Sequence, residues 1–410
     1  MSDEALRPTQ PGERLFHVDA LRGVAIFGIL VVNMMFFAWP FYHLLIEVEP
    51  WSGLANDMAQ GFIWFFTETK FITMFSLLFG FGFFMLFERA AARRQNVRPL
   101  FVRRLVVLLG FGLVHTLFFW VHDVLVYFAL VGFLLLMFRN KEPGSLTKWA
   151  VAAISIPVIV VLALGGLSAL AAATPEGAAE MEAAMSEQRA MFAEMYEQAL
   201  VTYGSGTFIE VTMQRSIDFI IEFIGSFLTS QLFLILAMFL TGLNLGKRGM
   251  LTDPEAHMPS WNRLLRWGLI VGLPTSAVYT VTGFLMEPMG AGLAATLHSA
   301  SAMIAGPAMC LAYVSLIVKG CRSERVRRVF TPVAAVGRNA LSNYLLQSVI
   351  CTTLFYGYGF GLFAGFGPAV GLLVTVAIYA FQLAVSSWYV SRFRYGPAEL
   401  LWRRLTYRAV

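Results

Sequence analysis

Two polar side chains lie within and just after the first long apolar stretch of the sequence, and they are the first candidates for chemistry. The amide Asn33 stands alone in the stretch 21–39, and His43 follows ten residues later. A neutral imidazole is a natural general base near pH 7, and an amide can orient a reacting group. We therefore predict Asn33 and His43 as a catalytic pair at one mouth of a membrane-embedded site. An interhelical hydrogen bond for Asn33 and a solvated ring for His43 are the alternatives.

Charged residues interrupt the second and third apolar stretches. Glu68 and Lys70 are two positions apart, so they point to different faces of a helix and each needs its own partner. A bilayer penalises ionisable groups, which makes both residues candidates for substrate binding, with a structural ion pair as the alternative. His115 lies on the third helix, and the adjacent His122 and Asp123 follow at a turn, where a carboxylate beside an imidazole can fix its tautomer. Asp123 as the cap of the next helix is the simpler interpretation.

Three amides follow one another at helical spacing near the end of the chain. Asn339, Asn343 and Gln347 are predicted to form a polar stripe on one face of an apolar helix. Such a stripe either joins helices or lines a cavity, and three amides favour the cavity. Asp19 and Arg22, which open the first stretch, complete the predicted substrate-binding set.

The composition is that of a membrane protein. The chain is 58% hydrophobic and 13% charged, with a net charge of +5, whereas soluble domains are about 45–50% apolar and about 25% charged. The basic residues lie between apolar runs rather than on one face of a soluble module, so we expect membrane lipids and no nucleic acid as partners. The three cysteines are scattered, so neither a disulfide framework nor a metal site is expected.

Repeated apolar runs predict an all-α polytopic membrane protein with about ten transmembrane helices. The run 21–39 spans about 28 Å at about 1.5 Å per residue, close to one hydrocarbon thickness. Basic residues concentrate in alternate connections, which places both termini in the cytoplasm by the positive-inside rule. The predicted segments are 21–42, 61–86, 105–120, 124–138, 149–171, 217–240, 267–284, 297–318, 332–351 and 367–390.

Three parts are expected along the chain. They are an N-terminal transmembrane part (1–140), a middle part with the fifth helix and an external segment (141–212), and a C-terminal transmembrane part (213–410). The external segment 172–212 begins with Thr174, Pro175 and Glu176, which is typical of a helix start. We predict an amphipathic helix there, either as a solvated spacer or as a lid over an outward pocket. No repeat relates the two halves, and no matched pair of interrupted helices is expected.

Several motifs resemble the YeiB family of bacterial inner-membrane proteins, which is also called domain of unknown function 418. The resemblance extends over essentially the whole chain and implies a multi-pass protein of the bacterial inner membrane. It implies no activity. The motifs that carry it are 19–23 with Asn33, 70–82, 337–348, 355–359 and 396–406.

The N-terminal part also resembles, more distantly, the transmembrane acyltransferases typified by heparan-α-glucosaminide N-acetyltransferase. The matching positions are Asp19, Arg22, Gly23, Asn33 and His43. The resemblance implies acyl transfer from a cytoplasmic acyl-CoA to an acceptor reached from the outer face. In that case His43 is the base and Asn33 orients the reacting group. Between Asn33 and the second helix the sequence departs from that family.

An integral membrane acyltransferase with acyl-CoA as donor is therefore the leading hypothesis. Arg22 and the arginines within 89–104 suit the phosphates of the donor, although membrane topology and anionic lipids explain them as well. The alternative is a transporter or exporter of a small polar or lipid-like molecule, in which Glu68, Lys70 or Asp218 handles protons or charge. A structural protein without substrate is a third interpretation, which the number of buried polar groups disfavours.

Two further expectations follow from this hypothesis. Asn33, Glu68, Asn339 and Asn343 are predicted to line one shared hollow within the membrane. The hypothesis depends on that convergence, because isolated polar groups would serve only helix packing. A homodimer is an expectation that rests only on how common such assemblies are.

Overall fold

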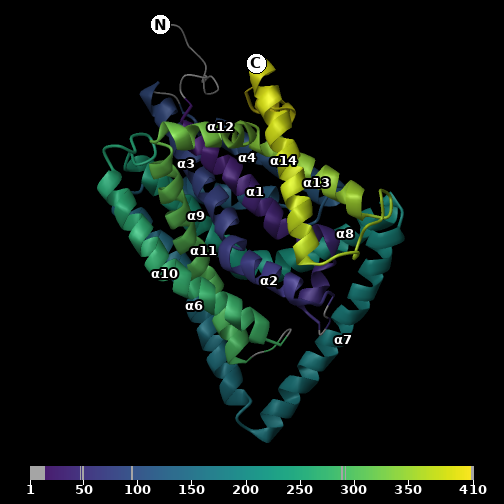
Figure 1. The fold of residues 1–410 in the computed structure, drawn as a ribbon. Helices are drawn as coiled ribbons and strands as arrows, with labels where there is room; N and C mark the ends of the chain where they lie inside the picture. Colours follow the sequence, from purple (N-terminus) through teal and green to yellow (C-terminus); the bar gives the residue numbers. More distant parts are fainter. Residues whose placement is uncertain are drawn as a thin grey trace.

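The computed structural model describes residues 14–46, 48, 50–93, 96–287, 290 and 292–407. Within these residues the chain forms helices and no strands (Figure 1). Eight helical stretches are long and apolar enough to cross a membrane, and two shorter apolar helices lie at Val124–Phe138 and Ala340–Phe355. These stretches occupy the positions of the ten predicted segments, in order. The prediction of an all-α polytopic membrane protein is confirmed.

The helices follow one another with short connections. Turns of 3-10 or π helix occur at Phe41–Leu44, Ile63–Thr67, Leu136–Phe138 and Phe223–Gln231. In chain order the α-helices are α1 (Phe16–Ala38), α2 (Leu54–Phe62), α3 (Lys70–Ala92), α4 (Arg98–Phe118), α5 (Val124–Leu135), α6 (Pro143–Ala171), α7 (Pro175–Ser205), α8 (Phe208–Glu222), α9 (Leu232–Lys247), α10 (Met258–Leu285), α11 (Leu293–Gly320), α12 (Glu324–Arg338), α13 (Ala340–Phe355), α14 (Pro368–Arg392) and α15 (Pro397–Tyr407).

The bundle has two different ends. One end, called the basic end, carries the arginine-rich connections and α12, which lies across the start of α1 (Figure 1). Arg14 and Tyr407, near the two termini, line the same cavity there, so both ends of the described chain lie on one side. The opposite end, called the outer end after the predicted orientation, is where α6 and α7 meet (Figure 1).

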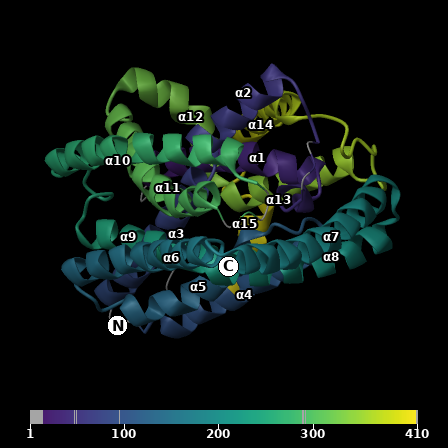
Figure 2. The same cartoon turned by 90° about the horizontal axis from the view of Figure 1, so that it is seen from below.

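Close approach of backbones holds the central helices together. A Cβ atom on Gly80 of α3 would lie 2.0 Å from the carbonyl oxygen of Phe239 on α9, and one on Gly242 would lie 1.9 Å from that of Leu77. Only glycine permits such an approach, which is a common way for membrane helices to pack. α1 packs against α12, α13 and α14, so the N-terminal and C-terminal parts are in contact. Figure 2 shows α10 beside α11 and α7 beside α8.

The second predicted segment is interrupted within its apolar run. The π turn Ile63–Thr67 ends at Glu68, which has extended backbone, and Thr69 has a positive φ of 67°. α3 begins at the next residue, Lys70, whose ammonium group donates a hydrogen bond of 2.8 Å to the carbonyl of Trp64. The bilayer requires partners for carbonyls that a break leaves free, and Lys70 is one such partner.

The ninth predicted segment is interrupted as well. The amphipathic helix α12 ends before Asn339 and the apolar helix α13 begins after it. Glu399 of α15 accepts hydrogen bonds from the backbone N–H groups of Leu341 (2.8 Å) and Ser342 (3.2 Å), so a carboxylate caps the start of α13. The predicted stripe is therefore wrong at Asn339, which lies outside the helix that carries Asn343. Each half of the chain contains one interrupted helix, contrary to the expectation from the sequence.

Candidate functional site

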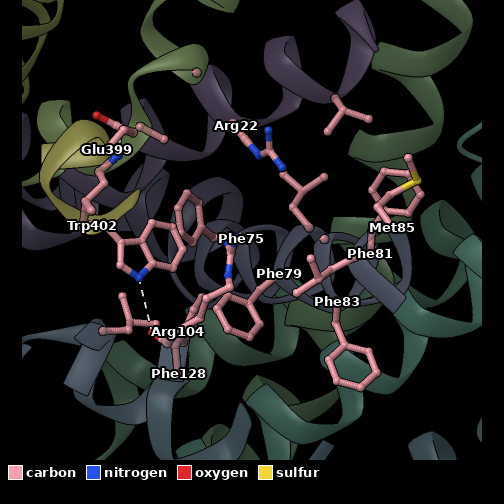
Figure 3. Close-up of a pocket in the computed structure, with 18 of the residues that line it drawn as sticks. Arg22, Phe75, Phe79, Phe81, Phe83, Met85, Arg104, Phe128, Glu399 and Trp402 are labelled. Carbon is pink, nitrogen blue, oxygen red and sulfur yellow. Dashed lines mark hydrogen bonds between the residues drawn. The ribbon is translucent and has the colours of Figure 1, made fainter. Parts of the chain in front are cut away.

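A cavity of about 320 Å³ at the basic end is rich in arginine (Figure 3). Its cations are Arg14, Arg22, Arg89, Arg104, Arg338 and Arg403. Arg338 Nε and Arg403 Nη1 are buried and have no hydrogen-bond partner among the described residues. A buried N–H group of a cation is unfavourable without an acceptor. The cavity therefore has a place for an anionic group.

The arginines of this basic cavity also affect one another. Burial lowers the pKa of Arg338, and the nearby Arg14 lowers it further. Burial likewise lowers the pKa of Arg403, to which Arg104 contributes. Asp19 balances part of the charge, since its carboxylate lies 3.2 Å from Arg22 and 3.9 Å from Arg14. A bound phosphate would relieve the remaining repulsion and satisfy the free N–H groups.

The depth of the basic cavity is apolar. Phe75 and Phe79 of α3 and Phe128 of α5 line it (Figure 3). Along α3 the lining extends from Arg89 to Phe75, a distance of about 21 Å at about 1.5 Å per residue. The cavity therefore leads from the arginines well into the thickness of the membrane.

A second cavity, of about 570 Å³, lies toward the outer end. No lysine or arginine of the described chain lines it, which distinguishes it from the basic cavity. His122 Nδ1 lies 2.8 Å from Glu222 Oε2, so an imidazole and a carboxylate are in contact in its wall. Its polar lining consists of Asn33, Thr67, Glu68, Thr69, His122, Asp123, Tyr127, Gln188, Glu222, Ser226, Gln231 and Tyr344.

The external segment forms one side of this outer cavity. The predicted helix start is confirmed, because α7 begins after Thr174, whose hydroxyl oxygen accepts a hydrogen bond of 3.1 Å from the N–H of Gly177. Gln188 and Phe192 of α7 line the cavity. Tyr203, near the end of α7, donates a hydrogen bond of 2.6 Å to Asp218 of α8. Of the two alternatives, the contacts of α7 agree with a cover over an outward pocket.

Three residues line both cavities and are here called the septum. They are Ile29 of α1, Val124 of α5 and Tyr344 of α13. Ligands bound in the two cavities would therefore approach each other at these side chains.

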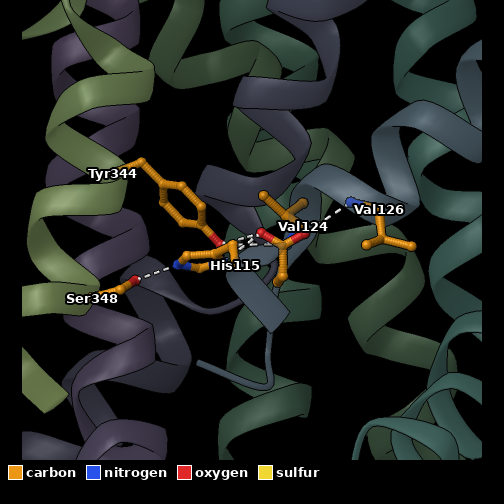
Figure 4. A network of polar contacts seen from close by, with 6 residues as sticks. His115, Val124, Val126, Tyr344 and Ser348 are labelled. Atoms are coloured by element: carbon orange, nitrogen blue, oxygen red, sulfur yellow. Dashed lines mark hydrogen bonds and ion pairs between the residues drawn. The ribbon is translucent and has the colours of Figure 1, made fainter. Parts of the chain in front are cut away.

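A buried polar network holds the septum (Figure 4). Asp123 Oδ1 lies 2.8 Å from His115 Nδ1 and accepts a hydrogen bond of 3.2 Å from the Tyr344 hydroxyl. Asp123 Oδ2 accepts a bond of 2.8 Å from the N–H of Val126, so Asp123 caps α5 as the simpler interpretation expects, whereas the imidazole that it contacts is His115 and not the adjacent His122. His115 Nε2 lies 2.8 Å from Ser348 Oγ. The network thereby links α4, α5 and α13.

A third hollow, of about 470 Å³, lies between α4, α13 and α14 and is here called the membrane groove. His115, Asn339 and Asn343 contribute to its lining. Asn343 Nδ2 donates a hydrogen bond of 3.0 Å to Ser386 Oγ of α14, so this amide joins two helices at the floor of the groove.

The predicted site residues are distributed over these three hollows. Asp19 and Arg22 line the basic cavity, Asn33, Glu68 and Asp123 line the outer cavity, and His115, Asn339 and Asn343 line the membrane groove. The prediction of one hollow shared by Asn33, Glu68, Asn339 and Asn343 is therefore wrong. The reason is that α13 starts at the basic end and turns its amides toward α14, away from the outer cavity. Acyl transfer thereby loses the support that the sequence analysis required, so any function has to be argued from other geometry.

Three predicted residues line none of the three hollows. The ring of His43 packs against Trp51, and its Nδ1 lies 2.7 Å from a backbone carbonyl three residues earlier. Lys70 binds the interrupted helix described above. Gln347 donates a hydrogen bond of 2.8 Å to Gln382 and joins α13 to α14. The assignment of these residues to a site stays a prediction.

The predicted site residues leave out six that the structure places at the site, among them His122 and Glu222 of the outer cavity. Tyr344 and Ser348 gave a weak signal, because they are four positions apart on one face of an apolar helix. Arg338 and Arg403 gave none beyond their charge, since membrane topology accounts for arginines at this end.

Comparison with known proteins identifies the family. The family described as "Protein of unknown function (DUF418)" matches residues 245–409. The uncharacterized protein YxaH of Bacillus subtilis (strain 168) is 35% identical over 422 residues, which cover 98% of this chain and 96% of that protein. The chain belongs to the DUF418 family.

A second DUF418 relative extends the comparison. The uncharacterized protein YeiB of Escherichia coli (strain K12) is 29% identical over 421 residues, which cover 97% of each chain. The resemblance seen in the sequence motifs is thereby confirmed. The names of these relatives state no substrate or reaction, so the function of this DUF418 protein has to be argued from its site.

Proposed function

We propose that this DUF418 protein is an integral membrane acyltransferase. It moves an acyl group from a cytoplasmic acyl-CoA-like donor to an acceptor that enters from the outer face. The observation that carries the proposal is the pair of cavities that differ in charge and share the septum of Ile29, Val124 and Tyr344. Transfer across a membrane needs two binding places with opposite access and a common boundary.

The donor binds in the basic cavity. Its phosphates contact Arg338 and Arg403, whose buried N–H groups lack acceptors within the described chain. A hydrogen bond to a charged group contributes about 1.5–3 kcal/mol. The apolar depth lined by Phe75 and Phe128 leads the arm that carries the thioester toward the septum.

The acceptor binds in the outer cavity, where His122 is the general base. Glu222 Oε2 lies 2.8 Å from Nδ1 of the ring without forming a hydrogen bond, and we assign Nε2 to take the proton. The acceptor oxygen or nitrogen then bonds to the thioester carbon, the carbon–sulfur bond breaks, and the thiolate takes up a proton on leaving. Asn33 lines the same cavity and orients the acceptor. His43 is the alternative base that the sequence predicts.

The interrupted helices favour a second function, which is transport of a small polar or lipid-like molecule. One break lies at Glu68 and Thr69 and the other at Asn339. Discontinuous helices build the substrate sites of many transporters, because their free backbone groups bind ligands or ions. In that case the septum is the gate and Glu68 carries charge.

The location and partners belong to the same proposal. Arginines at the basic end support a cytoplasmic side there, with both termini cytoplasmic, and the family resemblance supports the bacterial inner membrane. Membrane lipids and the donor are the proposed ligands, and the proposal includes neither a metal nor nucleic acid. A homodimer stays a prediction.

Binding and turnover of acyl-CoA test the proposal. Purified protein should show thermal stabilisation by acyl-CoA, and the free thiol should appear when an acceptor is added. We expect Arg338→Gln to weaken donor binding about tenfold, since a charge-assisted contact of about 1.5 kcal/mol is lost. Arg325→Gln on the exposed side of the same helix is the matched control and should bind normally. Protein-dependent solute uptake into proteoliposomes without acyl-CoA binding would establish the transporter instead.

A further inference from the structure

The membrane groove is a hollow that the proposed acyl transfer does not use. It lies between α4, α13 and α14 and reaches the start of α15. Val114 and Val349 at its rim are 53% and 41% exposed. Both residues belong to apolar helices at membrane positions, so the groove opens toward lipid rather than toward water.

Apart from the side-chain amide of Asn339, for which no hydrogen bond is seen among the described residues, three polar side chains of the groove are already bonded within the protein. Asn343 bonds Ser386, Ser342 bonds Glu399, and both ring nitrogens of His115 lie 2.8 Å from partners. A buried water needs about two to four polar partners, and the remaining walls are mostly aliphatic and aromatic. Hydrocarbon therefore suits this hollow better than water does.

The size of the groove fits a lipid chain. Its volume of about 470 Å³ is many times the roughly 30 Å³ that one water molecule takes up in the liquid, so it can hold a run of methylene groups. The bilayer is as apolar as the groove, so the hydrophobic effect does not favour moving a lipid chain from one to the other. Binding is favoured by van der Waals contacts, because the wall atoms of an unfilled hollow have no contact partners.

Charge at the basic end of the groove indicates the kind of lipid. The lining there includes Tyr389 of α14. Arg392 follows Tyr389 by three residues on the same helix, is exposed, and stacks on the ring of Trp388 at 4.7 Å. A cation beside an indole at the edge of the apolar region favours an anionic headgroup.

We propose that the membrane groove binds one hydrocarbon chain of an anionic phospholipid whose headgroup lies at Arg392. The site is separate from the basic and outer cavities, and it does not depend on the proposed acyl transfer. It would hold one lipid in a fixed place against the network of His115 and Ser348.

Photochemical cross-linking in nanodiscs tests the site with the full-length protein. The nanodiscs contain phosphatidylcholine and a small fraction of phosphatidylglycerol with a diazirine in its chain. We expect cross-links to concentrate on groove residues such as Leu346 and Val385. Val349→Trp fills the rim and should reduce them at least fivefold. Val376→Trp, at a residue of α14 that is 56% exposed and outside the groove, is the matched control and should leave them unchanged.

The preference for an anionic headgroup is tested by moving the diazirine from phosphatidylglycerol to phosphatidylcholine. With the diazirine on phosphatidylcholine we expect at least threefold fewer groove cross-links, and Arg392→Gln should remove this difference. Wild-type cross-links spread evenly over α6, α10 and the groove would overturn the proposal, even if a variant failed to fold. Cross-links from the groove to a second copy of the chain would overturn it in favour of a dimer contact.

Discussion

The basic and outer cavities share a boundary but differ in almost everything else. Six arginines line the first, whereas the described lining of the second has three carboxylates, from Glu68, Asp123 and Glu222, and no lysine or arginine. The outer cavity is partly closed by α7, a helix outside the predicted spans, while apolar membrane helices together with α12 and the short α15 form the basic one. On the proposed function, this difference in lining predicts ligands of opposite charge on the two sides of the septum.

The largest expected effect comes from breaking the network that holds the septum. We expect Asp123→Ala to lower the free energy of unfolding by about 3–5 kcal/mol, because removal of one partner leaves buried polar groups unpaired. His115 and Tyr344 lose their acceptor, and α5 loses its cap. Unfolding of the purified protein by heat or detergent measures the change. Ser348→Ala removes one bond and should cost about 1 kcal/mol, and equal effects of the two variants would contradict a central role for Asp123.

The second-largest expected effect is a loss of transfer rate that distinguishes the role of His122 from that of His43 at the outer end. His122→Gln should lower the transfer rate about 100-fold with donor binding unchanged, since general-base catalysis is worth about 10²–10⁴-fold. His43→Gln should keep most of the rate, because His43 does not line the outer cavity. The opposite result, a loss only in the His43 variant, would make His43 the base as the sequence predicts. Rates measured with saturating donor decide between them.

The smallest effect is a pH dependence of stability from His43. Burial lowers its pKa from 6.5 to about 4, and the nearby His122 contributes. The unfolded chain takes up the proton first, so the stabilisation is complete above pH 6.5 and is lost as the pH falls toward 4. We expect a loss of about 2 kcal/mol between pH 7 and pH 5, at about 1.36 kcal/mol per pKa unit. The loss should be absent in His43→Gln, and an equal loss in that variant would assign it to another group.

The positions of the helices could be predicted because apolar length alone determines them. The interruptions could not, because their causes lie elsewhere in the chain. The break at Asn339 depends on Glu399, sixty positions later, which caps α13. The break at Glu68 depends on Lys70 reaching back to a carbonyl, and the spacing of the two charges gave no sign of that bond.

The sequence indicated the chemical type of the site residues, but it did not indicate which of them share a cavity. Asn33 and Glu68 do share a cavity, whereas Asn343 faces α14. Which hollow a side chain enters depends on how its helix is rotated about its own axis. A helix that is apolar on all sides has no polar face in its sequence from which that rotation could be predicted. The bond between His115 and Ser348 joins residues 233 positions apart, beyond any local pattern.

The cap on α13 has a consequence for the order of assembly. Glu399 belongs to α15, which follows α13 and α14 along the chain, and burial raises the pKa of its carboxyl group as it docks on Leu341 and Ser342. Until α15 has been synthesised, the helix that bears Tyr344 lacks this acceptor for the N–H groups at its start. We therefore expect the septum to reach its final arrangement only when α15 docks, after the helices around it have entered the bilayer.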